Sequence, residues 1–235
     1  MSGATSDVWE AMSTARTIRR FTGEPVDDAT LERCLQAAMW APSGANAQAW
    51  RFVVLRSPEQ RAVVAKAAAR ALEVIEPVYG MSRPSDDDNS RRARTNRATY
   101  ELHDRAGEFT SVLFAQKHFP TASELLLGGS IFPAMQNFLL AARAQGLGAC
   151  LTSWGAYGGE QLLRDAVGVP DDWMLAGHIV VGWPKGRHGP VRRRPLAEVV
   201  NLDRWDDVAA ERTVNRSERG PVVSTETLRV TRMEN

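Results

Sequence analysis

The order of helical and strand-like segments is the feature that most constrains the fold of this chain. Both kinds of segment recur along the sequence, but they do not alternate regularly as strand–helix–strand units. This order favours an α+β fold over a doubly wound parallel sheet. We expect helices at 7–16, 27–39, 57–75, 131–145 and 159–167, and strands at 50–55, 111–115, 146–152 and 178–182.

We expect residues 1–235 to form a single domain. The hydrophobic content of 43% is enough for one substantial core, and no Pro/Gly/Ser-rich linker divides the chain. Residues 77–110 differ in character, because Pro77, Gly80 and Pro84 precede an acidic run and several arginines. We interpret 77–110 as a polar, mobile insertion and a candidate lid, with a solvated excursion as the alternative. Residues 206–235 are expected to be a polar, partly ordered C-terminal extension.

Charge and cysteine usage narrow the class of protein. The formal net charge of +1 gives no bulk attraction to nucleic acid or membrane. Cys34 and Cys150 lie in apolar runs, which favours buried thiols over a disulfide and fits a reducing compartment. The apolar stretch Ile131 to Ala142 is too short to span a bilayer, and residues 1–15 lack a signal-type apolar region. We therefore expect a cytoplasmic protein.

Several familiar catalytic motifs are missing from the sequence. There is no P-loop, no dinucleotide fingerprint after a strand, no H-E-x-x-H and no C-x-x-C, and Ser43 does not lie in a G-x-S-x-G elbow. The histidines lack Cys or acidic partners at metal-ligand spacing, so we expect no metal site. No catalytic side chain is predicted, and a bound cofactor is expected to carry any reaction.

Three segments have residue types that suit a phosphorylated, planar ligand. Arginines and a threonine at 16–20 could bind a phosphate, with a solvated basic face as the alternative. Small and amide residues at 41–50 could approach a heterocycle, or simply form a helix–strand loop. The strand 146–154 could lay its backbone along a ring, and the arginines at 192–194 could hold a phosphate; a buried strand and a solvated turn are the alternatives.

Together and in order, these segments resemble the nitroreductase family of flavin enzymes. The R-[ST]-x-R-[KR]-[FY] pattern occurs at 16–21, and A-P-S-x-x-N-x-Q-x-W at 41–50, with Ala49 where the family often has proline. Further matches are Q-N-F-L-L-A-A at 136–142, G-L-G at 146–148, V-G-W-P at 181–184 and R-R-P-L-A-E-V-V at 193–200. The resemblance covers about residues 8–205.

The resemblance implies a three-layer fold with a central, mainly antiparallel sheet, and an intertwined homodimer with FMN at the subunit interface. It implies that cofactor contacts come from both subunits. Contacts from one subunit are expected at Arg16, Thr17, Arg19, Arg20, Leu151, Thr152, Ser153, Trp154, Arg193 and Arg194, and from the other at Pro42, Ser43, Gly44, Asn46, Ser130 and Ile131. The family often has Pro-x-Glu-Gly where this chain has residues 151–154, so we expect main-chain contacts there, with a backbone N–H near the flavin N5.

The implied activity is a ping-pong reaction in which NADPH or NADH reduces FMN, which then reduces a nitroaromatic or quinone. Tyr100, Phe109 and Arg97 in the insertion are candidate substrate contacts, the two aromatic rings by stacking. Two alternatives remain open. One is other flavin chemistry on the same fold, either reductive dehalogenation or oxidative flavin cleavage. The other is a non-enzymatic flavin-binding protein.

Overall fold

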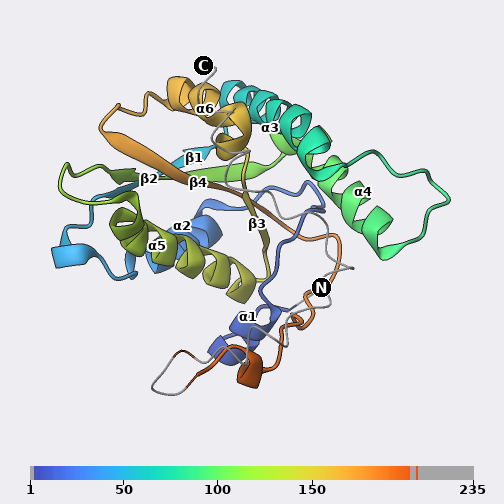
Figure 1. Ribbon diagram of the computed structural model, residues 1–235, viewed down its shortest axis with the longest axis horizontal. Helices are drawn as coiled ribbons and strands as arrows, with labels where there is room; N and C mark the ends of the chain where they lie inside the picture. Colours follow the sequence, from blue (N-terminus) through green and yellow to red (C-terminus); the bar gives the residue numbers. More distant parts are fainter. Residues whose placement is uncertain (1–2, 202–204, 206–235) are drawn as a thin grey trace.

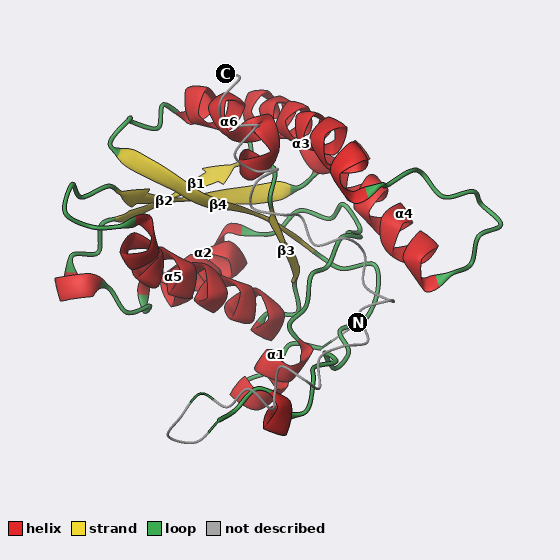
Figure 2. Cartoon of the chain, in the orientation of Figure 1, coloured by secondary structure: helices red, strands yellow, loops and turns green. Residues whose placement is uncertain are grey.

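The computed structural model describes residues 3–201 and 205. Its four-stranded sheet is antiparallel throughout, with the strand order β1-β2-β4-β3. Helices cover both faces of this sheet, which confirms the α+β fold expected from the sequence (Figure 1; Figure 2). The strands are β1 (Trp50–Leu55), β2 (Thr110–Lys117), β3 (Gly148–Thr152) and β4 (Trp173–Gly182), and the helices are α1 (Val8–Thr14), α2 (Asp28–Met39), α3 (Pro58–Tyr79), α4 (Arg91–Asp104), α5 (Glu124–Ala144) and α6 (Glu160–Val167).

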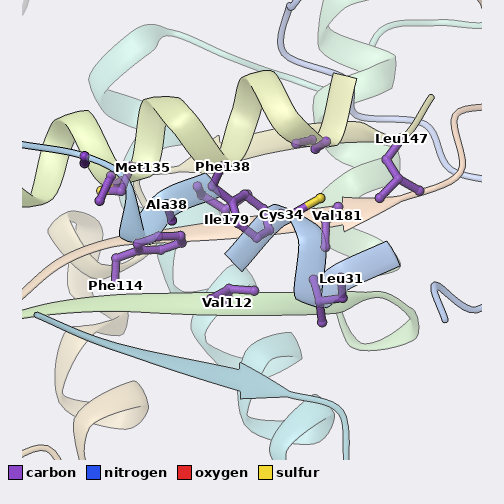
Figure 3. Close-up of a cluster of buried hydrophobic side chains, with 14 of the residues drawn as sticks. Leu31, Cys34, Ala38, Val112, Phe114, Met135, Phe138, Leu147, Ile179 and Val181 are labelled. Carbon is purple, nitrogen blue, oxygen red and sulfur yellow. The ribbon is translucent and has the colours of Figure 1, made fainter. Parts of the chain in front are cut away.

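One face of the sheet packs against α2 and α5. Phe114 on β2 contacts the ring of Phe138 on α5 edge to face, with centroids 5.5 Å apart. Burying large aromatic and aliphatic side chains in this way is the main stabilising contribution to the fold. Figure 3 labels ten residues of this cluster: Leu31, Cys34, Ala38, Val112, Phe114, Met135, Phe138, Leu147, Ile179 and Val181.

The opposite face of the sheet packs against α3, with α4 and α6 beside it (Figure 1). A second cluster of buried side chains fills this layer. Its members include Phe21, Leu55, Val64, Phe109, Trp154 and Leu163. Cys34 and Cys150 lie in the two clusters, one in each, and both are free and buried as expected.

Side-chain caps explain where the main helices begin. The Asp27 carboxylate accepts a hydrogen bond from the Thr30 backbone N–H at 2.8 Å, and the hydroxyls of Ser57 and Ser123 cap α3 and α5. Each cap satisfies a backbone donor that would otherwise have no partner in the first turn. Pro58 at the first position of α3 adds a backbone angle already suited to a helix.

Helix α5 begins at Glu124, seven residues before the expected start at 131. Ser123 caps the helix at this earlier start, and Gly128 and Gly129 lie inside it. With 21 residues, α5 is long and apolar enough to cross a membrane by length and composition alone, so the expectation that this stretch is too short was wrong. The helix packs against α2 and three strands of the sheet, as the core helix of a globular fold does.

Helix α3 continues beyond Ile75 to Tyr79, although Pro77 was expected to break it. Pro77 is exposed, so the Glu73 carbonyl that loses its helical partner can bind water instead. Gly80 ends the helix in the left-handed conformation, with φ of 56°.

Residues 77–110 were expected to be a mobile polar insertion, but much of this segment is helical. Helix α4 spans Arg91–Asp104 and buries Ala93, Tyr100, Leu102 and His103. Its few apolar residues give almost no helical periodicity, which is why the pattern did not predict it. Strand β2 is longer than expected because its polar ends, Thr110, Gln116 and Lys117, lack the apolar signal used to find it, and β4 begins at Trp173, five residues before the expected start at 178. The extension at 206–235 lies outside the described residues.

Candidate functional site

The segment 16–21 lies beside β3 and is held there by its backbone. Thr17 pairs with Ala149 as a parallel bridge, and the Ile18 N–H donates to the Ala149 carbonyl at 2.9 Å. A Cβ atom at Gly148 would lie 2.7 Å from Cγ2 of Ile18, so a glycine is needed for this close approach. Phe21 anchors the end of the segment, with its ring 5.0 Å from that of Phe109. The arginine side chains are therefore presented by a fixed backbone.

A pocket of about 250 Å³ collects three of the residues expected to bind phosphate. Arg16, Thr17 and Arg193 line it together with Arg143 and His188, and we call it the Arg16–Arg193 pocket. Arg143 is buried and committed to Glu10, Thr14 and the Gly3 carbonyl. Arg16 and Arg193 have no carboxylate partner among the described residues. Two guanidiniums and a hydroxyl fit a phosphate group chemically.

Arg19 and Arg20 face a different space. Both line a larger cavity, bounded by residues 16–20, helix α4 and residues 185–187, which we call the basic cavity. The Nε of Arg20 lies 2.8 Å from a carboxylate oxygen of Glu101, so this guanidinium already has a protein partner. Arg19 is half-buried and also lines a third cavity at the end of β3. The arginine motif therefore serves more than one cavity.

The third cavity, of about 350 Å³, lies where β3 ends, and we call it the strand-end cavity. Leu151, Thr152 and Ser153 line it, and the Leu151 side chain is 47% exposed. The Thr152 hydroxyl lies 3.1 Å from the His178 carbonyl, to which it donates. An exposed apolar side chain and a strand backbone beside an arginine suit a flat, partly polar ring. The role expected for residues 151–153 stays a prediction.

The Trp154 side chain is turned into the core, whereas the contact expected at 151–154 is a main-chain one. The side chain is 2% exposed, and its Nε1–H donates to Nε2 of His103 at 3.0 Å. His103 therefore carries its own proton on Nδ1, which donates to the Thr99 carbonyl at 2.8 Å. Burial lowers the pKa of His103, which keeps the ring neutral in this role. Trp154 ties the end of β3 to α4, and only its main chain remains near the cavity.

The loop after α2 is strained and lies far from the arginine motif within one chain. Ala45, Asn46 and Gln48 have φ values of 50°, 52° and 48°, an uncommon region for residues with side chains. The Ser43 hydroxyl accepts from the Gln48 N–H at 2.8 Å, which holds the turn together. In Figure 1 the turn Gly44–Asn46 is the light-blue turn at the left edge, whereas segment 16–21 lies on the other side of the molecule.

Ser130 and Ile131 on α5 have different environments. The Ser130 hydroxyl accepts from the Gly44 N–H at 3.3 Å, so it lies beside the strained loop as expected. Ile131 is fully buried in the core, so its side chain cannot contact a ligand there. Pro42, Gly44 and Asn46 are exposed, whereas Ser43 is half-buried. Of the residues expected from the second subunit, Ile131 is the one that the core excludes.

The three candidate substrate contacts in the insertion are engaged within the protein. Tyr100 is buried, and its hydroxyl donates to Glu76 at 2.7 Å. Phe109 is buried beneath the Arg105 guanidinium, whose centre is 5.0 Å from the ring centroid. Arg97 donates to the Ser85 carbonyl at 2.9 Å and holds the loop before α4. Stacking of the two buried rings on a substrate is therefore excluded in this conformation.

The sequence interpretation missed several residues around these cavities. The hydroxyls of Tyr79 and Tyr157 are 2.8 Å apart at the strand-end cavity, and this bond together with burial raises the pKa of Tyr157 to about 12. No short motif links two tyrosines so far apart in sequence. In the basic cavity, Arg91, Arg94, Lys185 and Arg187 face the arginine motif. Arg91 and Arg94 belong to the arginines noted in the 77–110 insertion, whereas Lys185 and Arg187 lie in no motif and were missed.

Arg194 is exposed and does not line the Arg16–Arg193 pocket. Arg193 therefore lines this pocket without Arg194, although both were expected to contact the cofactor. Arg193 itself donates to the Arg192 carbonyl at 2.9 Å through one guanidinium nitrogen.

Comparison with known proteins gives consistent matches. The sequence model of the nitroreductase family matches residues 12–183. A 5,6-dimethylbenzimidazole synthase from Rhodospirillum rubrum is 31% identical over 193 residues, which cover 80% of this chain and 83% of the relative. An NADH dehydrogenase from Thermus thermophilus is 26% identical, with 84% of this chain and 98% of the relative covered. Among solved structures, a nitroreductase homologue from Desulfovibrio desulfuricans in complex with FMN superimposes with a TM-score of 0.61 and 25% identity, covering 86% of this chain and 99% of the other.

Proposed function

The chain belongs to the nitroreductase family, and from this premise we propose that it is an FMN-dependent oxidoreductase that uses NADH or NADPH to reduce nitroaromatic or quinone acceptors. The observation that carries the proposal is the Arg16–Arg193 pocket beside the end of β3. It brings together the Thr17 hydroxyl with the guanidiniums of Arg16 and Arg193, which come from the first and the last of the matched motifs. The FMN complex of the Desulfovibrio desulfuricans homologue supports the same cofactor.

The side chains divide the binding of the cofactor between two cavities. Arg16, Thr17 and Arg193 bind the phosphate, since guanidiniums bind phosphate oxygens in pairs. The backbone of 151–153 and the exposed Leu151 side chain lie along one face of the ring, with Arg19 near its edge. When bound, FMN supplies two-electron transfer between a nicotinamide and an organic acceptor. The protein binds and orients both partners beside the ring.

We propose that a second copy of the chain completes the site. The loop 42–46 lies on the other side of the molecule from segment 16–21, so contact of both with one cofactor requires two subunits (Figure 1). Exposed apolar side chains support such an assembly, because large apolar patches on a protein surface mark interfaces. Those on α1 and α5 are Val8, Trp9, Met12, Leu125, Leu126 and Phe132.

Cys34 and Cys150 are free thiols, which is what a protein in a reducing compartment is expected to have. Burial raises the pKa of Cys34 to about 12 and that of Cys150 to about 11, so both stay protonated and unreactive. We propose a cytoplasmic location on this basis.

Anaerobic stopped-flow spectroscopy tests the donor. Protein purified with its flavin should be yellow and release FMN on denaturation, and NADH or NADPH should bleach the flavin band. Protein that remains colourless after incubation with FMN, or a flavin that neither nicotinamide bleaches, would refute the proposal. Repeated turnover of a nitroarene or quinone separates an enzyme from a flavin-storage protein.

A second candidate function is favoured by the relative from Rhodospirillum rubrum, which is 31% identical. In that case aerobic incubation of the reduced protein would consume its flavin and yield 5,6-dimethylbenzimidazole. Mass spectrometry of the small molecules released after such an incubation decides between the two. The first proposal requires that the flavin is recovered intact after many turnovers.

A further inference from the structure

The basic cavity is lined by a concentration of positive charge. It has a volume of about 510 Å³ and lies between residues 16–20, helix α4 and residues 185–187. None of its lining residues is acidic, and seven of them are cationic. Their positive charge is concentrated where three parts of the chain meet, although the protein as a whole has a net charge of only +1.

One carboxylate neutralises part of this charge. Glu101 lies 2.8 Å from Arg20, 3.0 Å from Lys185 and 3.7 Å from Arg105. Burial alone would raise the pKa of Glu101, but its bond to Lys185 and the nearby positive charges together lower it. Glu101 is therefore ionised at neutral pH and is shared among three cations.

The remaining cations have no such partner. Across residues 3–201, no carboxylate lies within 4.0 Å of the guanidiniums of Arg16, Arg19, Arg91, Arg94 or Arg187. Arg94 donates only to a backbone carbonyl, that of Asn89, at 2.7 Å. Like charges held together repel one another, so the cluster is unfavourable unless an anion joins it.

The phosphate contacts proposed for FMN overlap this cluster only in part. The Arg16–Arg193 pocket holds Arg193, Arg143 and His188, none of which lines the basic cavity, and the two spaces share only Arg16 and Thr17. The basic cavity adjoins the strand-end cavity at Arg19. A ligand placed over the flavin ring would thus lie next to unpaired guanidiniums.

We propose that the basic cavity binds a second phosphate group, carried by the ligand that exchanges electrons with the flavin. This inference rests on the proposed function. The number of unpaired guanidiniums suits a phosphate dianion better than a single carboxylate. Two sources supply that chemistry: the 2′-phosphate of NADPH, or a phosphorylated acceptor.

The first test removes two cations whose side chains have no hydrogen-bond or carboxylate partner among the described residues, so little of the fold depends on them. The variant Arg91→Gln/Arg187→Gln is compared with Arg92→Gln/Arg192→Gln, which removes the same charge from exposed arginines outside the cavity. Calorimetric titration of the FMN-loaded protein with 2′,5′-ADP should show affinity reduced about tenfold or more only in the first variant. Adenosine serves as the uncharged comparison.

Two kinetic arms identify the source of the phosphate. If the donor carries it, the apparent Kd of NADPH in flavin reduction rises more than that of NADH in the first variant. If the acceptor carries it, reoxidation by 4-nitrophenyl phosphate weakens relative to reoxidation by nitrobenzene. No difference between the two double variants in any of these measurements overturns the inference.

FMN retention is the remaining readout. Loss of FMN from Arg91→Gln/Arg187→Gln, beyond that from the matched control, would show that the cavity holds the flavin phosphate itself and would also overturn the inference. A flavin that neither nicotinamide bleaches refutes the proposed function instead, and the 2′,5′-ADP titration still reports on the cavity.

Discussion

Two arginine-rich segments face each other across the basic cavity, and the protein holds them in different ways. Residues 16–20 are fixed through their backbone, which hydrogen-bonds to Ala149 at the edge of the sheet. Helix α4 is fixed through side-chain hydrogen bonds. The Tyr100 hydroxyl donates to Glu76, and the Trp154 indole N–H donates to His103. Substitutions in the first segment should therefore change ligand binding with little effect on the fold. Substitutions beneath α4 should change where its arginines lie.

The largest effect is expected from removing the anchor of α4. Trp154→Ala leaves a cavity in the core and removes the hydrogen bond to His103, so the free energy of unfolding should fall by about 3–5 kcal/mol. Trp154→Phe keeps most of the packing and should lose much less. Urea unfolding measures both. Equal losses in the two variants would contradict a role for ring volume in anchoring α4.

The next effect concerns ligand binding through the segment fixed by its backbone. Arg16→Ala and Arg19→Ala should each weaken FMN binding, by about 10- to 150-fold for a charge-assisted contact. Arg97→Ala is the control, because its guanidinium holds backbone carbonyls at 85, 86 and 88 and lines none of the three cavities. Fluorescence titration of apoprotein with FMN makes the comparison. Similar losses in Arg97→Ala would argue against the assigned contacts.

Low pH should destabilise the fold around Trp154, because the buried His178 packs against its ring. Burial lowers the pKa of His178 from 6.5 to about 3, and its ring lies 5.2 Å from that of Trp154. The unfolded chain therefore binds a proton that the folded chain does not between these pH values, so stability falls as pH decreases from about 6.5 toward 3. The contribution of His178 is at most about 1.4 kcal/mol per pH unit.

The measurement is the difference in unfolding free energy between the wild type and His178→Gln at several pH values. That difference should change with pH below about 6.5. A constant difference for His178→Gln would mean that the ring does not stay neutral on folding.

The smallest effect is expected where a single hydrogen bond is removed. Tyr100→Phe deletes the bond to Glu76 while keeping the ring buried, so stability should fall by about 1 kcal/mol. Limited proteolysis in the loop at 85–90 should speed up in parallel, because α4 is less well held. Tyr157→Phe removes a different hydroxyl pair and should leave proteolysis in that loop unchanged.

The contrast between the two segments also explains what could be predicted from the sequence. Residues 16–21 and 41–50 have side chains in a fixed order that matches a family pattern. Strands β1 and β3 could be predicted because each is a short, largely apolar run. Helix α4 has only a few apolar residues, and its stability comes from partners far away in sequence, such as Glu76 and Trp154. Local patterns carry no information on such partners.

The errors in the candidate site have the same origin. Tyr100 and Phe109 were chosen because exposed aromatic rings often stack on substrates, but tertiary packing buries both. Ile131 was placed beside a ligand by its position after Ser130, whereas the turn of the helix directs it into the core. Conversely, Arg187 and Lys185 were overlooked because neither belongs to a motif. Only the fold brings them to Arg16.

The position of the strained loop at 43–48 has a thermodynamic consequence for the proposed assembly. If one chain supplies Arg16 and its partner supplies Asn46, cofactor binding and dimer formation are linked by mass action. Dilution below the dimer dissociation constant should then release FMN, and added FMN should shift the monomer–dimer equilibrium toward the dimer. The cofactor would act as a reporter of subunit concentration as well as a carrier of electrons.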